Sequence, residues 1–235
     1  MSDWKILAGV SVGYLYAIWF GYTMMKEQEA MKLGFLKMGH NIILFSLSLI
    51  MFIGILYEAT NTRETLFGLI CDPNNTYNRG PIFFWIWIFH LTKFYELLDT
   101  LILVLSKRPL TFLHVYHHLL TLFITWYGVY AKVTFQWWGL LLNSFVHVLM
   151  YYYYALRDTP YGKNIWWKRH LTQLQMVQFV VNLFVGVAWF YWELTYDCSG
   201  DVIVVGVTVF AQFTFLFLFI RFFARAYPEN KTKTT

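Results

Sequence analysis

The sequence predicts an all-α membrane protein in which seven transmembrane helices enclose a buried polar chamber in the cytosolic half of the bilayer. Hydrophobic residues make up 58% of the chain and charged residues only 13%, against ~45–50% and ~25% in an ordinary soluble domain. Aromatic residues reach 22%, and many stand at the ends of apolar runs, where side chains anchor at a headgroup interface. A soluble class of protein is therefore excluded.

Seven apolar runs are expected to span the membrane within a single transmembrane domain, residues 1–235. Several runs have only 17 residues, about 26 Å at ~1.5 Å per residue, which suits the thin bilayer of the endoplasmic reticulum. The fourth run is the least regular because it carries three histidines. The expected spans are Ile6–Tyr22, Asn41–Tyr57, Pro81–Leu105, Leu113–Val129, Trp137–Ala155, Leu174–Trp192 and Val202–Ile220.

The distribution of Lys and Arg predicts which loops are cytosolic. One set of loops holds thirteen of the 18 basic residues, the other holds four, and Lys93 lies inside a span. The positive-inside rule places the richer set in the cytosol, so we expect a lumenal N-terminus and a cytosolic C-terminus. The richer set is Lys26, Lys32, Lys37, Lys107, Arg108, Arg157, Lys163, Lys168, Arg169, Arg221, Arg225, Lys231 and Lys233, and the poorer set is Lys5, Arg63, Arg79 and Lys132.

Two further features agree with this orientation. The cytosolic tail, residues 225–235, ends in "KTKTT", which resembles the dilysine signal that retrieves membrane proteins to the endoplasmic reticulum. Cys71 and Cys198 both fall in loops assigned to the oxidising lumen, which permits a disulfide between them. The sequon at Asn74 is also lumenal, although its closeness to the third span could block glycosylation.

Polar side chains that are costly inside a membrane gather on one face of each of four spans. All four groups lie in the cytosolic half of their spans, which is why a common chamber is expected. Simpler roles stay open for some of them: a bare ion pair, interhelical hydrogen bonds, or an interfacial tyrosine belt. The groups are Lys93, Glu96, Asp99 and Thr100; His114, His117 and His118; Asn143, His147, Met150, Tyr151 and Tyr154; and Thr172, Gln175 and Gln178.

The three histidines of "HVYHH" point to chemistry rather than packing. Di-iron membrane enzymes use eight or more histidines, whereas this chain has seven, and we expect His40, His90 and His170 to lie outside the cluster. A single zinc held by three histidines remains an alternative. Acyl transfer usually employs Cys or Ser, but both cysteines are assigned to the lumen, so a histidine nucleophile with a second histidine as base is favoured.

Taken together, four motifs identify a family resemblance. "KFYELLDT", "HVYHH", "NSFVHVLMYYYY" and "TQLQMVQ" resemble, in order and spacing, the signatures of the ELO family of very-long-chain fatty-acid elongases. The match covers residues 93–178. The resemblance implies a condensing enzyme, an acyltransferase that joins a long-chain acyl-CoA to malonyl-CoA and releases CO2, CoA and a 3-ketoacyl-CoA two carbons longer.

The resemblance also implies roles for the polar residues. His117 would attack the acyl thioester, His147 would act as base or acid, and His118, Asn143 and His114 would complete the catalytic group. Preorganised donors at a developing oxyanion are often the largest catalytic contribution. The supporting residues would fix imidazole orientation, and they are Lys93, Glu96, Asp99, Thr100, Tyr151, Gln175 and Gln178.

Substrates and partners follow from the same resemblance. CoA carries several phosphates, and basic residues on the cytosolic rim could receive them. We expect no metal or redox cofactor and no nucleic acid, whereas the reductases and dehydratase of the elongation cycle are candidate partners and homo-oligomer formation is left open. The CoA-binding candidates are Lys107, Arg108, Tyr153, Lys168, Arg169 and Arg225.

Two other classes of protein stay open. A metal-dependent membrane lipid oxygenase or hydrolase would also use buried histidines. A seven-helix receptor or transporter would share the spans, but its ligand site would more naturally open outward or lie at mid-depth. The sequence does not determine the preferred length or unsaturation of the acyl chain.

Overall fold

The computed structural model describes residues 4–61, 65–76, 80–157, 159–160, 162 and 165–228. Every regular element in this part of the chain is a helix. Lys231 and Lys233 of the tail, with Arg63, Arg79 and Lys163, lie outside the described residues. The helices are α1 (Trp4–Met25), α2 (Gly34–Asn61), α3 (Leu66–Ile70), α4 (Pro81–Glu96), α5 (Leu98–Leu105), α6 (Phe112–Tyr130), α7 (Gln136–Arg157), α8 (Lys168–Tyr196) and α9 (Val202–Ala226).

The third expected span, Pro81–Leu105, differs from the prediction of one continuous helix. It is divided at Leu97 into α4 and α5, because the Leu97 N–H bonds to Phe94 O at 3.3 Å and the Thr100 N–H bonds to Leu97 O at 3.2 Å. These i to i−3 bonds replace the α-helical pattern for one turn. The break lies between Glu96 and Asp99, and the two carboxylates consequently meet different partners.

Four helices of the described residues are long and apolar enough to cross a membrane: α1, α2, α8 and α9. The expected fourth and fifth spans also form helices, α6 and α7, but the histidines, amides and hydroxyls of the motifs lower their hydropathy. These apolar helices, with the family assignment below, make the chain a multi-pass membrane protein.

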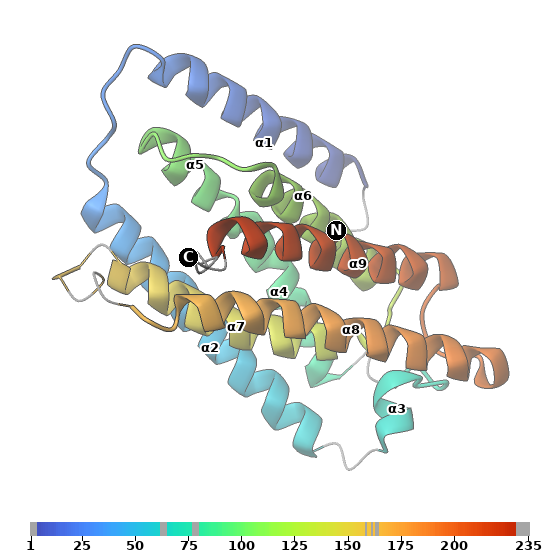
Figure 1. Ribbon diagram of the computed structural model, residues 1–235. Coiled ribbons are helices and arrows are strands. Elements are labelled where there is room, and N and C mark those ends of the chain that lie inside the picture. The colour runs from blue at the N-terminus through green and yellow to red at the C-terminus, as the bar shows by residue number, and fades with distance from the viewer. Residues whose placement is uncertain are drawn as a thin grey trace, which may run out of the picture.

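The long helices pack around a common centre. Successive neighbours are α2, α4, α6, α9, α8 and α7, and α7 packs extensively against α2 to close the ring, while α1 lies outside against α5 and α6. In Figure 1 the α1–α2 and α7–α8 connections and the last turn of α9 are on the left, and α3 and the α8–α9 connection are on the right. This alternation matches chain segments that cross a bilayer back and forth.

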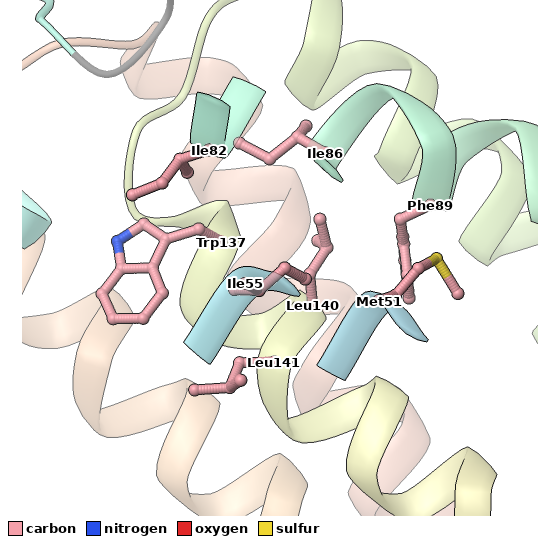
Figure 2. Close-up of a cluster of buried hydrophobic side chains, with 8 residues drawn as sticks. All are labelled: Met51, Ile55, Ile82, Ile86, Phe89, Trp137, Leu140 and Leu141. Atoms are coloured by element: carbon pink, nitrogen blue, oxygen red, sulfur yellow. The ribbon is translucent and has the colours of Figure 1, made fainter. Parts of the chain in front are cut away.

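One hydrophobic core holds α2, α4 and α7 together. Figure 2 shows side chains from all three helices converging there, with Ile55 fully buried and Trp137 2% exposed. Burial of each large apolar side chain is worth about 1.5–3 kcal/mol against water. The cluster comprises Met51, Ile55, Ile82, Ile86, Phe89, Trp137, Leu140 and Leu141. It fixes α4 and α7, which carry two of the polar motifs.

A second core lies near α3. Cys71, just after α3, forms a disulfide with Cys198 in the α8–α9 connection. The backbone N–H of Ser199 donates to Cys71 O at 2.8 Å, and the Trp189 indole N–H donates to Ser199 O at 3.3 Å. Around them pack Ile70, Val133, Phe135, Val204 and Val205. This disulfide core joins the loops between α2 and α4, α6 and α7, and α8 and α9.

Candidate active site

An internal cavity with an empty volume of about 860 Å3, part of it open to the outside, lies within the ring of helices. Side chains of α4, α6, α7, α8 and α9 line it. His117, Lys93, Asn143 and Gln178 come from the four sequence motifs, so the structure brings one member of each motif to one space. The other lining residues are mostly apolar.

The structure separates the three histidines of α6. His117 lines the cavity, and its ring packs 5.1 Å from the ring of Phe215 on α9. His118 is 6% exposed, does not line the cavity, and lies against His114 with ring centroids 4.4 Å apart. The Thr111 side chain caps α6 by accepting the His114 N–H, which fixes the first turn. Of the three, His117 is placed to meet a ligand in the cavity.

Lys93 connects the groups contributed by α4 and α7. Its Nζ donates to Glu96 Oε1 at 2.8 Å and to Asn143 Oδ1 at 3.2 Å. Because an ammonium group is only a donor, it fixes the Asn143 amide with its oxygen toward Lys93 and its NH2 turned elsewhere. His147 Nδ1 lies 3.6 Å from Glu96 Oε1.

Asp99 faces a different set of partners beyond the break at Leu97. Its Oδ1 lies 2.7 Å from His40 Nε2, and its Oδ2 accepts from the Tyr151 hydroxyl at 2.9 Å. His40 therefore joins the polar network through Asp99, a role that the sequence did not predict. The expected span starts at Asn41, but α2 begins at Gly34 and places His40 inside a helix, 6% exposed. A histidine at the edge of an apolar run was the sequence signal available for this role.

Thr100 extends the network to α1. Its hydroxyl, fully buried, lies 2.8 Å from His114 Nε2 and 2.8 Å from the hydroxyl of Tyr14. Since Thr100 has a single proton to donate, the Tyr14 and His114 contacts are coupled: if Thr100 donates to His114, it accepts from Tyr14. Tyr14 has no counterpart among the residues expected at the site, because one tyrosine in an apolar run carries no distinguishing pattern.

The remaining motif residues differ in whether they line the cavity. Gln178 lines the cavity, whereas Gln175 Nε2 lies 3.8 Å from Met150 Sδ and so joins α8 to α7. Gln175 therefore fits the simpler role of an interhelical contact. Tyr153, a CoA-binding candidate, is 8% exposed and packs against the Trp167 ring.

The other CoA-binding candidates are exposed at helix ends. Lys168 and Arg169 begin α8, and Arg225 lies in the last turn of α9. Arg169 stacks on the Phe223 ring at 5.4 Å, and Lys168 lies 5.8 Å from the Tyr227 ring, so these cations are held where α8 meets α9. Lys107 and Arg108 follow α5, and Lys107 Nζ donates to Lys26 O at 3.4 Å.

Metal ligation was the competing interpretation of the histidines. Among the residues that the structure describes, no three His, Cys, Asp or Glu side chains form a group that could hold a metal ion. His114, His147 and His40 instead face Thr100, Glu96 and Asp99, respectively. The geometry gives no support to a zinc site.

The cavity also carries polar residues that no sequence motif marks. Gln136, Asn182 and Gln212 line it together with Thr121, Thr125 and Thr208. Single amides within apolar helices are typical of interhelical contacts, so the sequence alone gave no reason to select them.

The fold and the site define a multi-pass helical membrane protein with imidazole, amide and ion-pair groups around an apolar internal cavity. The ELO family, described as the GNS1/SUR4 family, matches residues 1–235. The chain belongs to this family.

Curated relatives are named as fatty acid elongases. The chain is 37% identical over 229 residues to fatty acid elongase A of Dictyostelium discoideum, covering 94% of this chain and 83% of that protein. It is 34% identical to fatty acid elongase sre1 of the same organism, covering 99% and 87%. It is 32% identical to human very long chain fatty acid elongase 4, covering 98% and 73%.

Proposed function

We propose that this protein condenses a long-chain acyl-CoA with malonyl-CoA to give a 3-ketoacyl-CoA two carbons longer. The observation that carries the proposal is the position of His117 in the wall of a largely apolar cavity, which the amide side chain of Asn143 also lines. A nucleophile at one end of an apolar space suits a fatty acyl thioester. The names of the relatives, fatty acid elongases, support the same substrate class.

The first half-reaction would transfer the acyl group to His117. A ring nitrogen attacks the thioester carbonyl, the C–S bond breaks, and CoA leaves as the thiol after taking a proton. The Asn143 NH2, whose amide oxygen accepts from Lys93, would donate to the developing oxyanion; one such donor is worth about 2.7–4 kcal/mol in known enzymes. The product of this step is an acyl-imidazole.

The second half-reaction would use malonyl-CoA. Loss of CO2 from the malonyl group leaves an enolate, whose carbon attacks the acyl-imidazole, and the C–N bond to His117 breaks. His147, held by Glu96, serves as acid or base in the exchange of protons. Decarboxylation drives the reaction, so this mechanism needs no metal or redox cofactor.

We further propose seven membrane crossings, with α4 and α5 together making the third and α6 and α7 the fourth and fifth. The cationic ends of α8 and α9 would lie in the cytosol beside the CoA phosphates, and the Cys71–Cys198 disulfide would lie in the lumen of the endoplasmic reticulum. His117 then falls in the cytosolic half of its span. Glycosylation tags at either end of the chain would test the orientation.

The decisive experiment supplies purified protein with an acyl-CoA alone. Intact mass spectrometry should show the acyl adduct and free CoA should be released, and both should vanish in His117→Ala. Adding radiolabelled malonyl-CoA should then give the 3-ketoacyl product. Release of CoA only after malonyl-CoA is added would exclude the acyl-histidine intermediate, and absence of label in any product would exclude condensation and favour a receptor or transporter.

A further inference from the structure

The cavity contains a second polar level, farther from the cationic helix ends than His117. It lies about one helical turn along α6, α7, α8 and α9, roughly 4.5–6 Å at ~1.5 Å per residue. The pairs of cavity-lining residues that mark the two levels are His117 and Thr121, Asn143 and Gly139, Gln178 and Asn182, and Phe215 and Gln212.

The space continues past this level. Gly128, Val133, Phe135 and Val185 line it beyond the second turn, and Val133 and Phe135 belong to the disulfide core. A long chain attached at His117 would therefore pass the second level in its interior, with its end still farther on. Any polar group at this level faces the body of the chain rather than the reacting carbonyl.

Two polar atoms at this level lack partners. Asn182 Nδ2 donates to Gln212 Oε1 at 3.2 Å, which leaves Asn182 Oδ1 as a buried acceptor. Within the described part of the chain, neither Asn182 Oδ1 nor the indole Nε1 of Trp138 has a hydrogen-bond partner, and both atoms are buried. Both residues line the cavity, and a β-carbon on Gly139, the neighbour of Trp138 in the chain, would stand 3.9 Å from Asn182 Oδ1.

Unpaired buried polar atoms lower stability, so a ligand that pairs them gains affinity. The vacant pair is one donor, the Trp138 N–H, and one acceptor, Asn182 Oδ1. A ketone or a carbon–carbon double bond could accept from Trp138 but has nothing to donate to Asn182. A hydroxyl does both, accepting from the indole and donating to the amide oxygen.

We propose that the cavity selects acyl chains that carry a hydroxyl group in the chain, bound between Trp138 and Asn182. Hydroxyacyl-CoAs would then be a preferred substrate class. This inference rests on the proposed condensation, since it assumes an acyl chain attached at His117. It adds a specificity site to that reaction and changes none of its chemical steps.

The test compares acyl-CoAs of one length that differ only in the position of a single hydroxyl, with the unsubstituted chain as reference. We expect kcat/KM to peak for one region of hydroxyl positions, about tenfold or more above the unsubstituted chain, because a site built for a hydroxyl rejects its analogue. If kcat/KM is the same for every hydroxyl position and for the unsubstituted chain, the two atoms bind only water. That result would overturn the hydroxyl site alone. If none of the acyl chains is extended, the proposed condensation is overturned as well.

Single substitutions test whether Trp138 and Asn182 cause the preference for a hydroxyl. Trp138→Phe removes the donor and Asn182→Leu removes the acceptor, and each should bring the ratio of kcat/KM between the best hydroxyacyl chain and the unsubstituted chain close to one. The ratio is independent of the folded fraction of each variant. Thr208→Val is the matched control, because Thr208 also lines the cavity but its hydroxyl already donates to Val204 O at 2.9 Å. A preference unchanged in Trp138→Phe and Asn182→Leu would refute the assignment.

Discussion

Lys93 Nζ on α4 lies 3.2 Å from Asn143 Oδ1 on α7, while the same ammonium group lies 2.8 Å from Glu96 Oε1. A buried cation thus orients an amide that lines the cavity and also neutralises a buried carboxylate. Both members of the ion pair are almost fully buried, at 2% and 3% exposure of their side chains. The arrangement predicts that Lys93 affects both stability and activity.

Lys93→Met should reduce both properties. It leaves the Glu96 charge unpaired, which costs about 3–5 kcal/mol of stability for a buried pair, and it releases the Asn143 amide. Thermal unfolding in detergent and the condensation assay measure the two effects. The double variant Lys93→Met/Glu96→Gln separates them: we expect it to regain most of the stability, whereas condensation stays about 10²–10³-fold low, the usual loss for one oxyanion donor. Wild-type activity in the double variant would refute the positioning role of Lys93.

His40→Ala should destabilise the protein through Asp99, which would lose the contact at 2.7 Å. A loss of about 1–3 kcal/mol is expected for a group left partly unpaired in the interior. A double-mutant cycle with Asp99→Asn should give a coupling of about 0.5–3 kcal/mol between the two sites. His170→Ala is the control, because His170 is exposed and its Nδ1 lies 3.0 Å from Oε1 of nearby Gln173, and its effect should stay within about 0.5 kcal/mol. Additive effects of His40→Ala and Asp99→Asn would contradict the contact.

Phe135→Ala should let the enzyme make longer products, because Phe135 lines the far part of the cavity and packs in the disulfide core. Mass spectrometry of the acyl products gives their length distribution. Leu141→Ala is the control. Leu141 is 9% exposed and Phe135 7% exposed, but Leu141 belongs to the core between α2, α4 and α7 and does not line the cavity. Both should cost stability, about 2–5 kcal/mol, and only Phe135→Ala should shift product length. An unchanged distribution in Phe135→Ala would show that the chain does not reach this residue.

Removal of the disulfide by Cys71→Ser/Cys198→Ser should lower stability by about 2–5 kcal/mol. The bond closes a loop with a sequence separation of 127 residues and ties the core around Trp189. A thiol reductant should lower the unfolding temperature of the unaltered protein to that of the double variant. The double variant itself should not respond to the reductant, and a response would reveal an effect unrelated to this bond.

Gly54→Ala should weaken the packing of α2 against α4, since a β-carbon there would overlap the ring of Trp85. A forced shift of this kind costs about 1–3 kcal/mol. Gly39→Ala, in the same helix, meets nothing within 4 Å and should instead stabilise by about 0.5–1 kcal/mol. Thermal unfolding of the two variants gives the sign of each effect, and equal effects would contradict the close approach of the helices.

The sequence alone determined the helical class, the position of the long helices and the polar face of each motif. These properties are local: apolar runs define membrane helices, and the 3.6-residue repeat places Asn143 and His147, four residues apart, on the same side of α7. Six expected spans lie within observed helices. The disulfide could also be predicted, because the chain has two cysteines and both fall on the same side of the predicted topology.

The tertiary structure set how the motif faces meet. It divided the third span at Leu97, sent Glu96 toward Lys93 and Asp99 toward His40, and turned His117 rather than His118 into the cavity. It also placed Asn182 beside Gln212. Such relations join residues of different helices and depend on how each helix is rotated and shifted against its neighbours. Side-chain packing across the whole ring sets that rotation, and no local pattern in the sequence carries it.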